Sequence, residues 1–171
     1  SHLDVFPTLC DLLDLPKPER LEGVSLVPLL ARTATSIRGR IFAETNYHAV
    51  YEPARCVRTD RYKLIRHYGD SDRPRPANVD DSPTKDLASH AGYFQEPRSR
   101  EQLFDLHRDP QERVDRSQYD EYAAIRSQLG SDLDRWMNET GDPLLSGSVP
   151  RPAGSILNKP DAWSPTEETY E

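Results

Sequence analysis

The sequence predicts an α+β domain in which a small antiparallel sheet of about four strands packs against a long C-terminal helix. Three short stretches with roughly alternating apolar and polar residues lie at 40–45, 54–59 and 62–66. Connections this short cannot form parallel crossovers, so these stretches should pair as an antiparallel meander. A fourth strand is expected at 101–106. Helical periodicity over 118–138 supplies the helix that would cover the sheet.

The first 30 residues predict two short helical pieces. Asp4 can cap a helix that carries Pro7 in its first turn, where the missing N–H of proline costs little. This helix should end before Pro16. Residues 25–30 form a second helical turn whose three leucines point to one side, at Leu26, Leu29 and Leu30.

The long helix is the clearest element of the pattern. Its apolar residues recur at steps of three and four, namely Tyr122, Ile125, Leu129, Leu133, Trp136 and Met137. Gly141 is well placed to end it. Residues 69–100 are rich in Asp, Pro, Ser and Arg and predict a long loop or insertion. Residues 146–171 form a Pro/Ser-rich tail that either wraps a surface or is disordered.

Composition limits the classes of partner. The chain has 171 residues, of which 35% are hydrophobic, and 15 prolines, which favours a modest core with long polar loops. The net charge of -7, with no basic run, excludes nucleic acid as an expected partner.

The cysteines do not indicate a metal site, and the apolar segments do not indicate a membrane span. Cys10 and Cys56 lack metal-ligand spacing and are interpreted as two buried free thiols, with a disulfide as the weaker alternative. No apolar run is long enough to span a membrane. The first residues, from Ser1 to Asp4, lie in the middle of a structural phrase, so a preceding region is expected.

Several phrases, in a fixed order, resemble the C-terminal region of sulfatases of the alkaline phosphatase superfamily. They are SHLDVFPTL at 1–9, LEGVSL at 21–26, RYKLI at 61–65, QLFDL at 102–106 and DPQE at 109–112. Two further segments look most like the sulfamidase branch, the heparan N-sulfatases (N-sulfoglucosamine sulfohydrolases), at 44–58 and 136–143. The resemblance covers the chain up to the end of the long helix and leaves the tail unmatched.

The resemblance implies three parts. Residues 1–36 would be the end of a large α/β sulfatase domain and its connection, so that the N-terminal α/β portion is incomplete. Residues 37–145 would be the C-terminal subdomain, with 69–100 as its long loop or insertion. Residues 146–171 would be the tail.

The chemistry of the family is expected to lie on other residues. The resemblance implies a formylglycine, which is made from the Cys or Ser of a C/S-x-P-x-R phrase. It also implies a calcium ion that is held by Asp and Asn oxygens. That phrase is absent here, and the similar stretch 148–151 has its Arg one position too early. We therefore assign no catalytic and no metal-binding residue to this chain. Calcium and formylglycine are expected in the full-length enzyme, neither being carried by this chain.

Substrate recognition is the role that remains. A smaller domain can place loops over the mouth of the main pocket, where cations pair with sulfate and rings pack on sugars. The dense cluster of such residues is Tyr47, His48, Tyr51 and Arg55, and we predict that it forms a pocket rim that binds substrate. The same residues also fit a purely structural role, in which Arg55 pairs with Glu44 and the tyrosines cover the core.

The predicted function is that of a C-terminal part of a sulfatase that hydrolyses sulfate esters or N-sulfates of sugars. Its partners would be its own N-terminal catalytic domain and a sulfated sugar, and the chain alone would be inactive. Two alternatives remain open: a stand-alone carbohydrate-binding or interaction module, and part of a phosphodiesterase or phosphonate hydrolase of the same superfamily. The sequence leaves both extracytoplasmic and cytoplasmic locations open.

Overall fold

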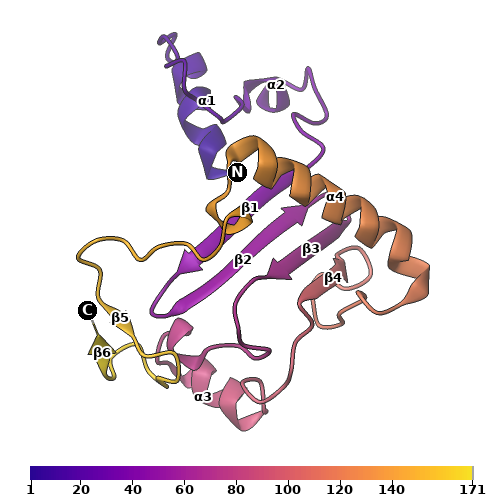
Figure 1. The fold of residues 1–171 in the computed structure, drawn as a ribbon. Coiled ribbons are helices and arrows are strands. Elements are labelled where there is room, and N and C mark those ends of the chain that lie inside the picture. The colour runs from indigo at the N-terminus through magenta and orange to yellow at the C-terminus, as the bar shows by residue number, and fades with distance from the viewer. Residues whose placement is uncertain (171) are drawn as a thin grey trace. The chain divides into compact units, whose positions relative to one another are not determined.

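The computed structural model describes residues 1–170 and divides into two compact units, one ending at Ile41 and the other beginning at Phe42 (Figure 1). The contacts between residues lie mainly within each unit. The first is helical, and the second contains the sheet and the long helix. The predicted α+β class, with a four-stranded antiparallel sheet, is confirmed.

The N-terminal unit contains a 3-10 turn, His2–Asp4, followed by helix α1, Val5–Leu12, and the single turn α2, Val27–Leu30. Both predicted helical pieces are therefore present. The role predicted for Asp4 is wrong, because its side chain does not cap α1. It is buried and accepts a hydrogen bond from the Val24 amide at 2.8 Å, and it also pairs with Arg38. Asp4 thus fastens the loop that follows α1 rather than the helix itself.

Gly23 is required by the packing of this unit. A Cβ at this position would lie 1.8 Å from the carbonyl oxygen of Leu3, which is backbone and cannot move aside alone. The loop and the start of the chain therefore approach at a distance that glycine alone permits.

The sheet contains β1, Ile41–Tyr47, β2, Tyr51–Arg58, β3, Tyr62–His67, and β4, Glu101–Asp105, in the order β1-β2-β3-β4. Val57 lies opposite Leu64, and Leu64 lies opposite Leu103, so one face of the sheet carries an apolar row. The turn between β2 and β3 is closed by a 2.8 Å hydrogen bond from the Thr59 amide to the Tyr62 carbonyl.

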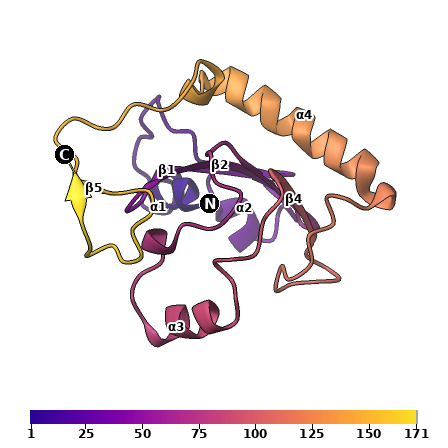
Figure 2. The ribbon, with the colours of Figure 1, turned by 60° about the horizontal axis from the view of Figure 1, so that its bottom comes forward.

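Helix α4, Ala123–Thr140, lies across that apolar row (Figure 1). Figure 2 shows the sheet nearly edge-on, with α4 on one side and the segment of α3 on the other. The main core consists of Val57, Leu64, Leu103, Tyr122, Leu129, Leu133 and Met137. The helix starts five residues later than its predicted start at 118, because residues 120–122 form a 3-10 turn. Gly141 ends it in the left-handed conformation, at φ 63°, as predicted.

The segment 69–100 is more structured than predicted. It contains a 3-10 turn, Pro76–Asn78, and a helix that the sequence did not indicate, α3, Pro83–His90. Ser82 caps α3 by accepting a hydrogen bond from the Lys85 amide, and Pro83 stands at its first position. The sequence of α3 has no apolar stripe, since Leu87 is its large apolar residue and is 70% exposed. A helix without such a stripe gives no periodic signal.

The tail wraps the second unit, which is the ordered one of the two predicted outcomes. The 3-10 turn Pro143–Leu145 precedes the tail. The tail itself contains a small ladder formed by β5, Leu157–Asn158, and β6, Thr169–Tyr170. The Asn158 amide donates to the Ala49 carbonyl at 2.9 Å. Ala162 completes a second small core with Val50 and Ala77. The tail therefore packs on the segments around the β1–β2 connection and around 77.

Lys85 holds the tail to α3. Its buried ammonium donates to the carbonyls of Trp163 at 2.6 Å and Val79 at 2.9 Å, and to Asp81 at 2.9 Å. We expect Lys85→Met to lower the free energy of unfolding by about 1–3 kcal/mol, because buried acceptors lose their donor. Faster proteolysis and amide exchange near Trp163 would show that the tail has loosened. Lys159→Met is the matched control, since Lys159 pairs with Glu168 at the surface; an equal effect of the two changes would contradict the prediction.

Both cysteines are free thiols, Cys10 buried and Cys56 partly buried. Burial raises the pKa of the Cys56 thiol, which makes it a poor nucleophile. Among the described helices, none is both long and apolar enough to cross a membrane.

Candidate functional site

The four predicted substrate-binding residues lie around the connection between β1 and β2. Tyr47 ends β1, His48 lies in the turn, and Tyr51 begins β2. His48 is exposed, and the two tyrosines are half-buried. Arg55 lies in the middle of β2 and is fully buried. The structure thus presents three of the four residues at the surface and buries the fourth within the sheet.

The two tyrosines form a pair that fixes the tail. Their ring centroids are 4.7 Å apart, at a tilt of 37°. The Tyr47 hydroxyl donates to the Val149 carbonyl at 2.7 Å, and the Val149 amide donates to the Tyr51 hydroxyl at 3.0 Å. Both main-chain groups of Val149 are therefore used, so the pair and the tail segment hold one another in place.

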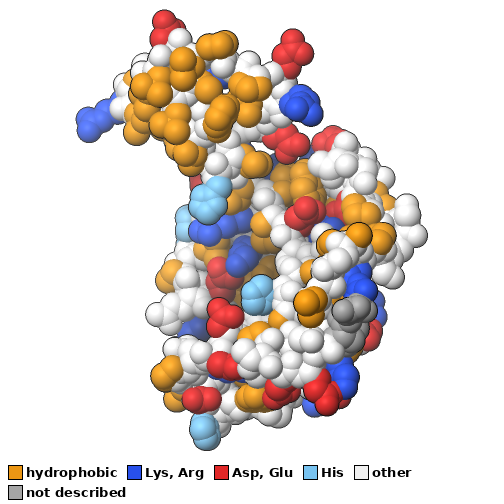
Figure 3. Space-filling view, turned by 90° about the vertical axis from the view of Figure 1, so that its left-hand side faces the viewer, with side chains coloured by type: hydrophobic (Ala, Val, Ile, Leu, Met, Phe, Trp, Pro, Cys, Tyr) orange, Lys and Arg blue, Asp and Glu red, His pale blue; other side chains and the backbone are white. Residues whose placement is uncertain are grey.

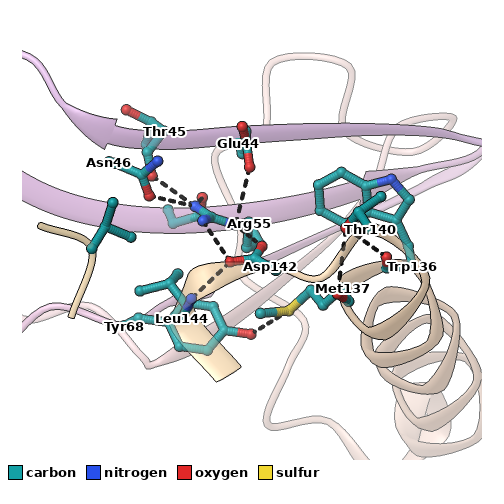
Figure 4. A network of polar contacts seen from close by, with 12 residues as sticks. Glu44, Thr45, Asn46, Arg55, Tyr68, Trp136, Met137, Thr140, Asp142 and Leu144 are labelled. Atoms are coloured by element: carbon teal, nitrogen blue, oxygen red, sulfur yellow. Dashed lines mark hydrogen bonds and ion pairs between the residues drawn. The ribbon is translucent and has the colours of Figure 1, made fainter. Parts of the chain in front are cut away.

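Arg55 is an anchor within the protein (Figure 4). Its Nε and Nη2 donate to the two carboxylate oxygens of Asp142 at 2.5 and 2.9 Å, in the bidentate geometry typical of strong pairs. Its Nη1 donates to oxygens of Thr45, Asn46 and Ala54, each at 2.9 Å. Arg55 therefore connects β1, β2 and the residue that follows the C-terminal cap of α4.

This pair sets the charge of Asp142. The hydrogen bond from Arg55 is the main cause that lowers the pKa of Asp142, and the Leu144 amide, which donates to the same carboxylate at 2.9 Å, acts in the same direction. Glu44 approaches the Arg55 Nε at 3.5 Å and is itself half-exposed. The pairing with Glu44 considered from sequence thus exists beside the stronger one with Asp142.

A pocket of about 500 Å³ opens next to the tyrosine pair, with Tyr51 in its wall. Its volume falls within the range of roughly 300–1,000 Å³ typical of small-molecule sites. Its lining comes from β2, the segment after β3, the 3-10 turn that follows α4, and the tail, namely Tyr51, Tyr68, Gly69, Asp70, Arg75, Leu144, Gly147, Ser148 and Pro160.

Sequence reasoning did not assemble this pocket. Asp70 lies in the segment predicted to be a long loop or insertion, and its side chain is highly exposed. Tyr68 and Arg75 gave no signal, because their partners lie about 70 to 85 positions further along the chain. The hydrogen bond from Arg75 to the Pro160 carbonyl could not be anticipated from any local pattern.

The described residues offer no set of metal ligands. Within residues 1–170, no three side chains of His, Cys, Asp or Glu come together in a way that could hold a metal ion. The acidic residues at 70, 72, 80 and 81 are exposed, and Asp81 is engaged by Lys85 and Ser164. The side chains present do not fit a calcium site of the kind that sulfatases use.

The chain is similar in sequence to known sulfatases. It is 28% identical over 155 residues to the ulvan-active sulfatase of Formosa agariphila, covering 86% of this chain and 30% of that protein. It is 29% identical over 170 residues to the human N-sulphoglucosamine sulphohydrolase, covering 85% of this chain and 33% of that protein. The chain therefore spans about a third of the length of the curated relatives that it matches.

The fold agrees with this likeness. A solved structure described as a 2-O GAG sulfatase superposes with a TM-score of 0.60 and 25% identity, covering 84% of this chain and 26% of that one. The family model of the C-terminal region of N-sulphoglucosamine sulphohydrolase matches residues 1–87, just over half of the chain. The chain therefore belongs to the N-sulphoglucosamine sulphohydrolase C-terminal family of sulfatases.

Proposed function

We propose that this chain is the C-terminal part of an enzyme that hydrolyses sulfate esters or N-sulfates of sugars, in which it braces the catalytic domain and shapes its substrate pocket. The observation that carries the proposal is an exposed apolar surface on the N-terminal unit. The proposal is also supported by the fact that the chain matches only about a third of the length of its sulfatase relatives.

This apolar surface is formed by α1 and the residues on either side of it. Phe6 is 53% exposed and Leu13 is 64% exposed, and the other members are Leu3, Val5, Leu9, Leu12 and Leu15. In Figure 3 these side chains contribute to the large hydrophobic area at the top of the view. A protein that is complete in itself rarely leaves so many neighbouring leucines in water. We propose the catalytic domain of the same polypeptide as the partner that covers them.

The competing functions predict other features. A stand-alone carbohydrate-binding module would need no partner and should not carry this surface. Hydrolysis of phosphoesters or phosphonates would use the same scaffold, but the curated relatives named above are sulfatases. Sulfate is therefore the better supported substrate group, with a sugar or an amino sugar as its carrier.

The division of labour follows from the side chains present. We propose that residues 1–36 belong structurally to the catalytic domain, 37–145 to the C-terminal subdomain, and 146–171 to its wrapping tail. Calcium and a formylglycine would be supplied by the preceding polypeptide, where together they provide the nucleophile and the counter-charge for sulfate. This chain would bind and orient the sugar.

The rim consists, in this proposal, of Tyr47, His48 and Tyr51, with Arg55 as a positioning residue. His48 is exposed at the tip of the connection and can donate to a sulfate or carboxylate. The tyrosine rings can pack on a sugar face. Arg55 contributes by holding β1 and β2 together beneath them through its contacts with Thr45 and Asn46.

The proposal is tested by expressing the longer polypeptide and measuring sulfate release from N-sulfoglucosamine and from a sugar O-sulfate. We expect turnover that needs calcium, and none from the 171-residue chain alone. The double change Phe6→Asp and Leu9→Asp should abolish activity of the longer protein and raise its proteolysis, because two charges would be buried at the interface.

The matched control is Leu87→Asp, which changes a similarly exposed leucine on α3 and should leave turnover unaltered. Turnover by the 171-residue chain alone would overturn the proposal. So would full activity of the Phe6→Asp, Leu9→Asp protein, since the apolar surface would then have no partner.

A further inference from the structure

The pocket beside Tyr51 has fixed walls. One wall is Tyr68 and Gly69, where β3 ends, and the Tyr68 hydroxyl donates to the Met137 sulfur at 3.0 Å. Gly147 and Ser148 of the tail also line the pocket, and the next residue, Val149, is held by the tyrosine pair. A cavity with braced walls loses little entropy when a ligand enters it.

Arg75 supplies the cationic group of this pocket. Its side chain is 18% exposed, its Nη1 donates to the Pro160 carbonyl at 2.9 Å, and its Nη2 donates to Asp70 at 2.7 Å. Among the contacts described for residues 1–170, these two leave other N–H donors of the guanidinium for a ligand. The main-chain bond keeps the guanidinium in place whether or not Asp70 stays bound.

The partner of Arg75 is easily displaced. The Asp70 side chain is 89% exposed, so its ion pair is screened by water and contributes little stability. An anionic group that enters the pocket can take its place at Arg75 while Asp70 turns to solvent. The ligand anion then takes the place of the carboxylate beside the guanidinium, and Asp70 keeps its own charge, which water solvates.

The remaining lining suits a sugar ring. Tyr51, Tyr68, Leu144 and Pro160 supply apolar surface, and the Ser148 hydroxyl can donate or accept a hydrogen bond. A pyranose presents C–H groups on its faces and hydroxyls on its edge, which matches apolar walls with a few polar groups. A lone inorganic anion would leave the apolar part of this volume empty.

We propose that this pocket binds a single sugar ring that carries one anionic group, and that the anion replaces Asp70 at Arg75. The choice of a sugar rests on the proposed function, whereas the charge exchange rests on the geometry of Arg75 and Asp70.

The test is titration of the 171-residue chain with glucuronate, glucose 6-sulfate, glucose and inorganic sulfate, followed by amide NMR shifts at Gly69, Gly147 and Ser148. We expect saturable shifts with at least one of the two anionic sugars, and weaker binding of glucose by about tenfold or more, because it lacks a charged hydrogen-bond partner. Comparison of glucuronate with glucose 6-sulfate identifies the anion as carboxylate or sulfate.

Two variants should move affinity in opposite directions. Arg75→Gln should lower the affinity for the anionic sugar by about tenfold or more. Asp70→Asn should raise that affinity, because the competing carboxylate is gone. Arg73→Gln is the matched control, with the same loss of charge at an exposed position outside the pocket. An unchanged amide spectrum elsewhere shows that each variant is folded; if Arg75→Gln alters that spectrum, Asp70→Asn decides the matter alone.

Equal affinity for glucose and both anionic sugars, or weaker binding after Asp70→Asn, would overturn the inference. Inorganic sulfate bound as tightly as the anionic sugars would also overturn it. If the longer protein releases sulfate but the shifts are absent, the proposed function stands and the pocket does not bind the sugar. If the shifts are present but no sulfate is released, the pocket binds the sugar and the proposed function is wrong.

Discussion

Replacing Asp142 with alanine is expected to lower the free energy of unfolding by about 3–5 kcal/mol, because it leaves a buried guanidinium without its counter-charge. Arg55 is fully buried, and Asp142 accepts two of its hydrogen bonds. The change also removes the acceptor of the Leu144 amide just after α4. Urea denaturation followed by circular dichroism measures the difference, with tryptophan fluorescence as a second probe.

A compensating pair separates charge burial from packing. Arg55→Met together with Asp142→Leu should be far less destabilising than Asp142→Ala, since a hydrophobic replacement of a buried pair is often nearly neutral. Asp134→Ala, which removes an exposed carboxylate from α4, is the control for charge alone. A loss below about 1 kcal/mol for Asp142→Ala would place the pair among the weak ones at protein surfaces.

The same pair gives a direction for the effect of pH. Arg55 lowers the pKa of Asp142 in the folded state, so the stabilisation from this pair is fully present above the pKa that Asp142 has in the unfolded chain. The stabilisation is lost as the pH falls through the lower pKa that Asp142 has in the folded state. The stability of the Asp142→Ala protein should therefore depend less on acid than that of the parent protein.

Leu133→Ala should cost about 2–5 kcal/mol, because it opens a cavity in the main core between α4 and the sheet. Leu133 is fully buried and lies in one cluster with Val57, Leu64 and Leu103. Thermal and urea unfolding both measure the loss. Leu145→Ala is the control, since Leu145 is half-exposed and should shift stability by less than about 0.5 kcal/mol. Equal effects of the two changes would show that α4 does not pack on the sheet as described.

The fold was predictable where periodicity and turn chemistry agree. The four strands and the apolar stripe of α4 follow directly from residue spacing, and Gly141 stops the helix as its conformational freedom suggests. Helix α3 was missed because it is held by a capping serine and a buried lysine rather than by an apolar face. Such a helix has no hydrophobic period to detect.

The candidate site was predictable only in part. The local run from Tyr47 to Tyr51 identified the connection that now carries the proposed rim. The burial of Arg55 was not predictable, because its partner Asp142 stands 87 positions away. Asp4 was assigned to the nearest helix for the same reason, although the amide it binds belongs to a loop 20 positions later. Side chains that satisfy distant main-chain groups leave no local pattern.

The way in which the tail is fastened bears on any shortened version of the protein. A recombinant boundary drawn directly after α4 would look natural, because the last long helix ends there. It would nevertheless delete the carbonyl that receives the Tyr47 hydroxyl and the one that receives the Lys85 ammonium. It would also uncover Val50 and Ala77. A truncated product of this kind would be prone to aggregation, so crystallisation and binding work should retain the last 26 residues, 146–171.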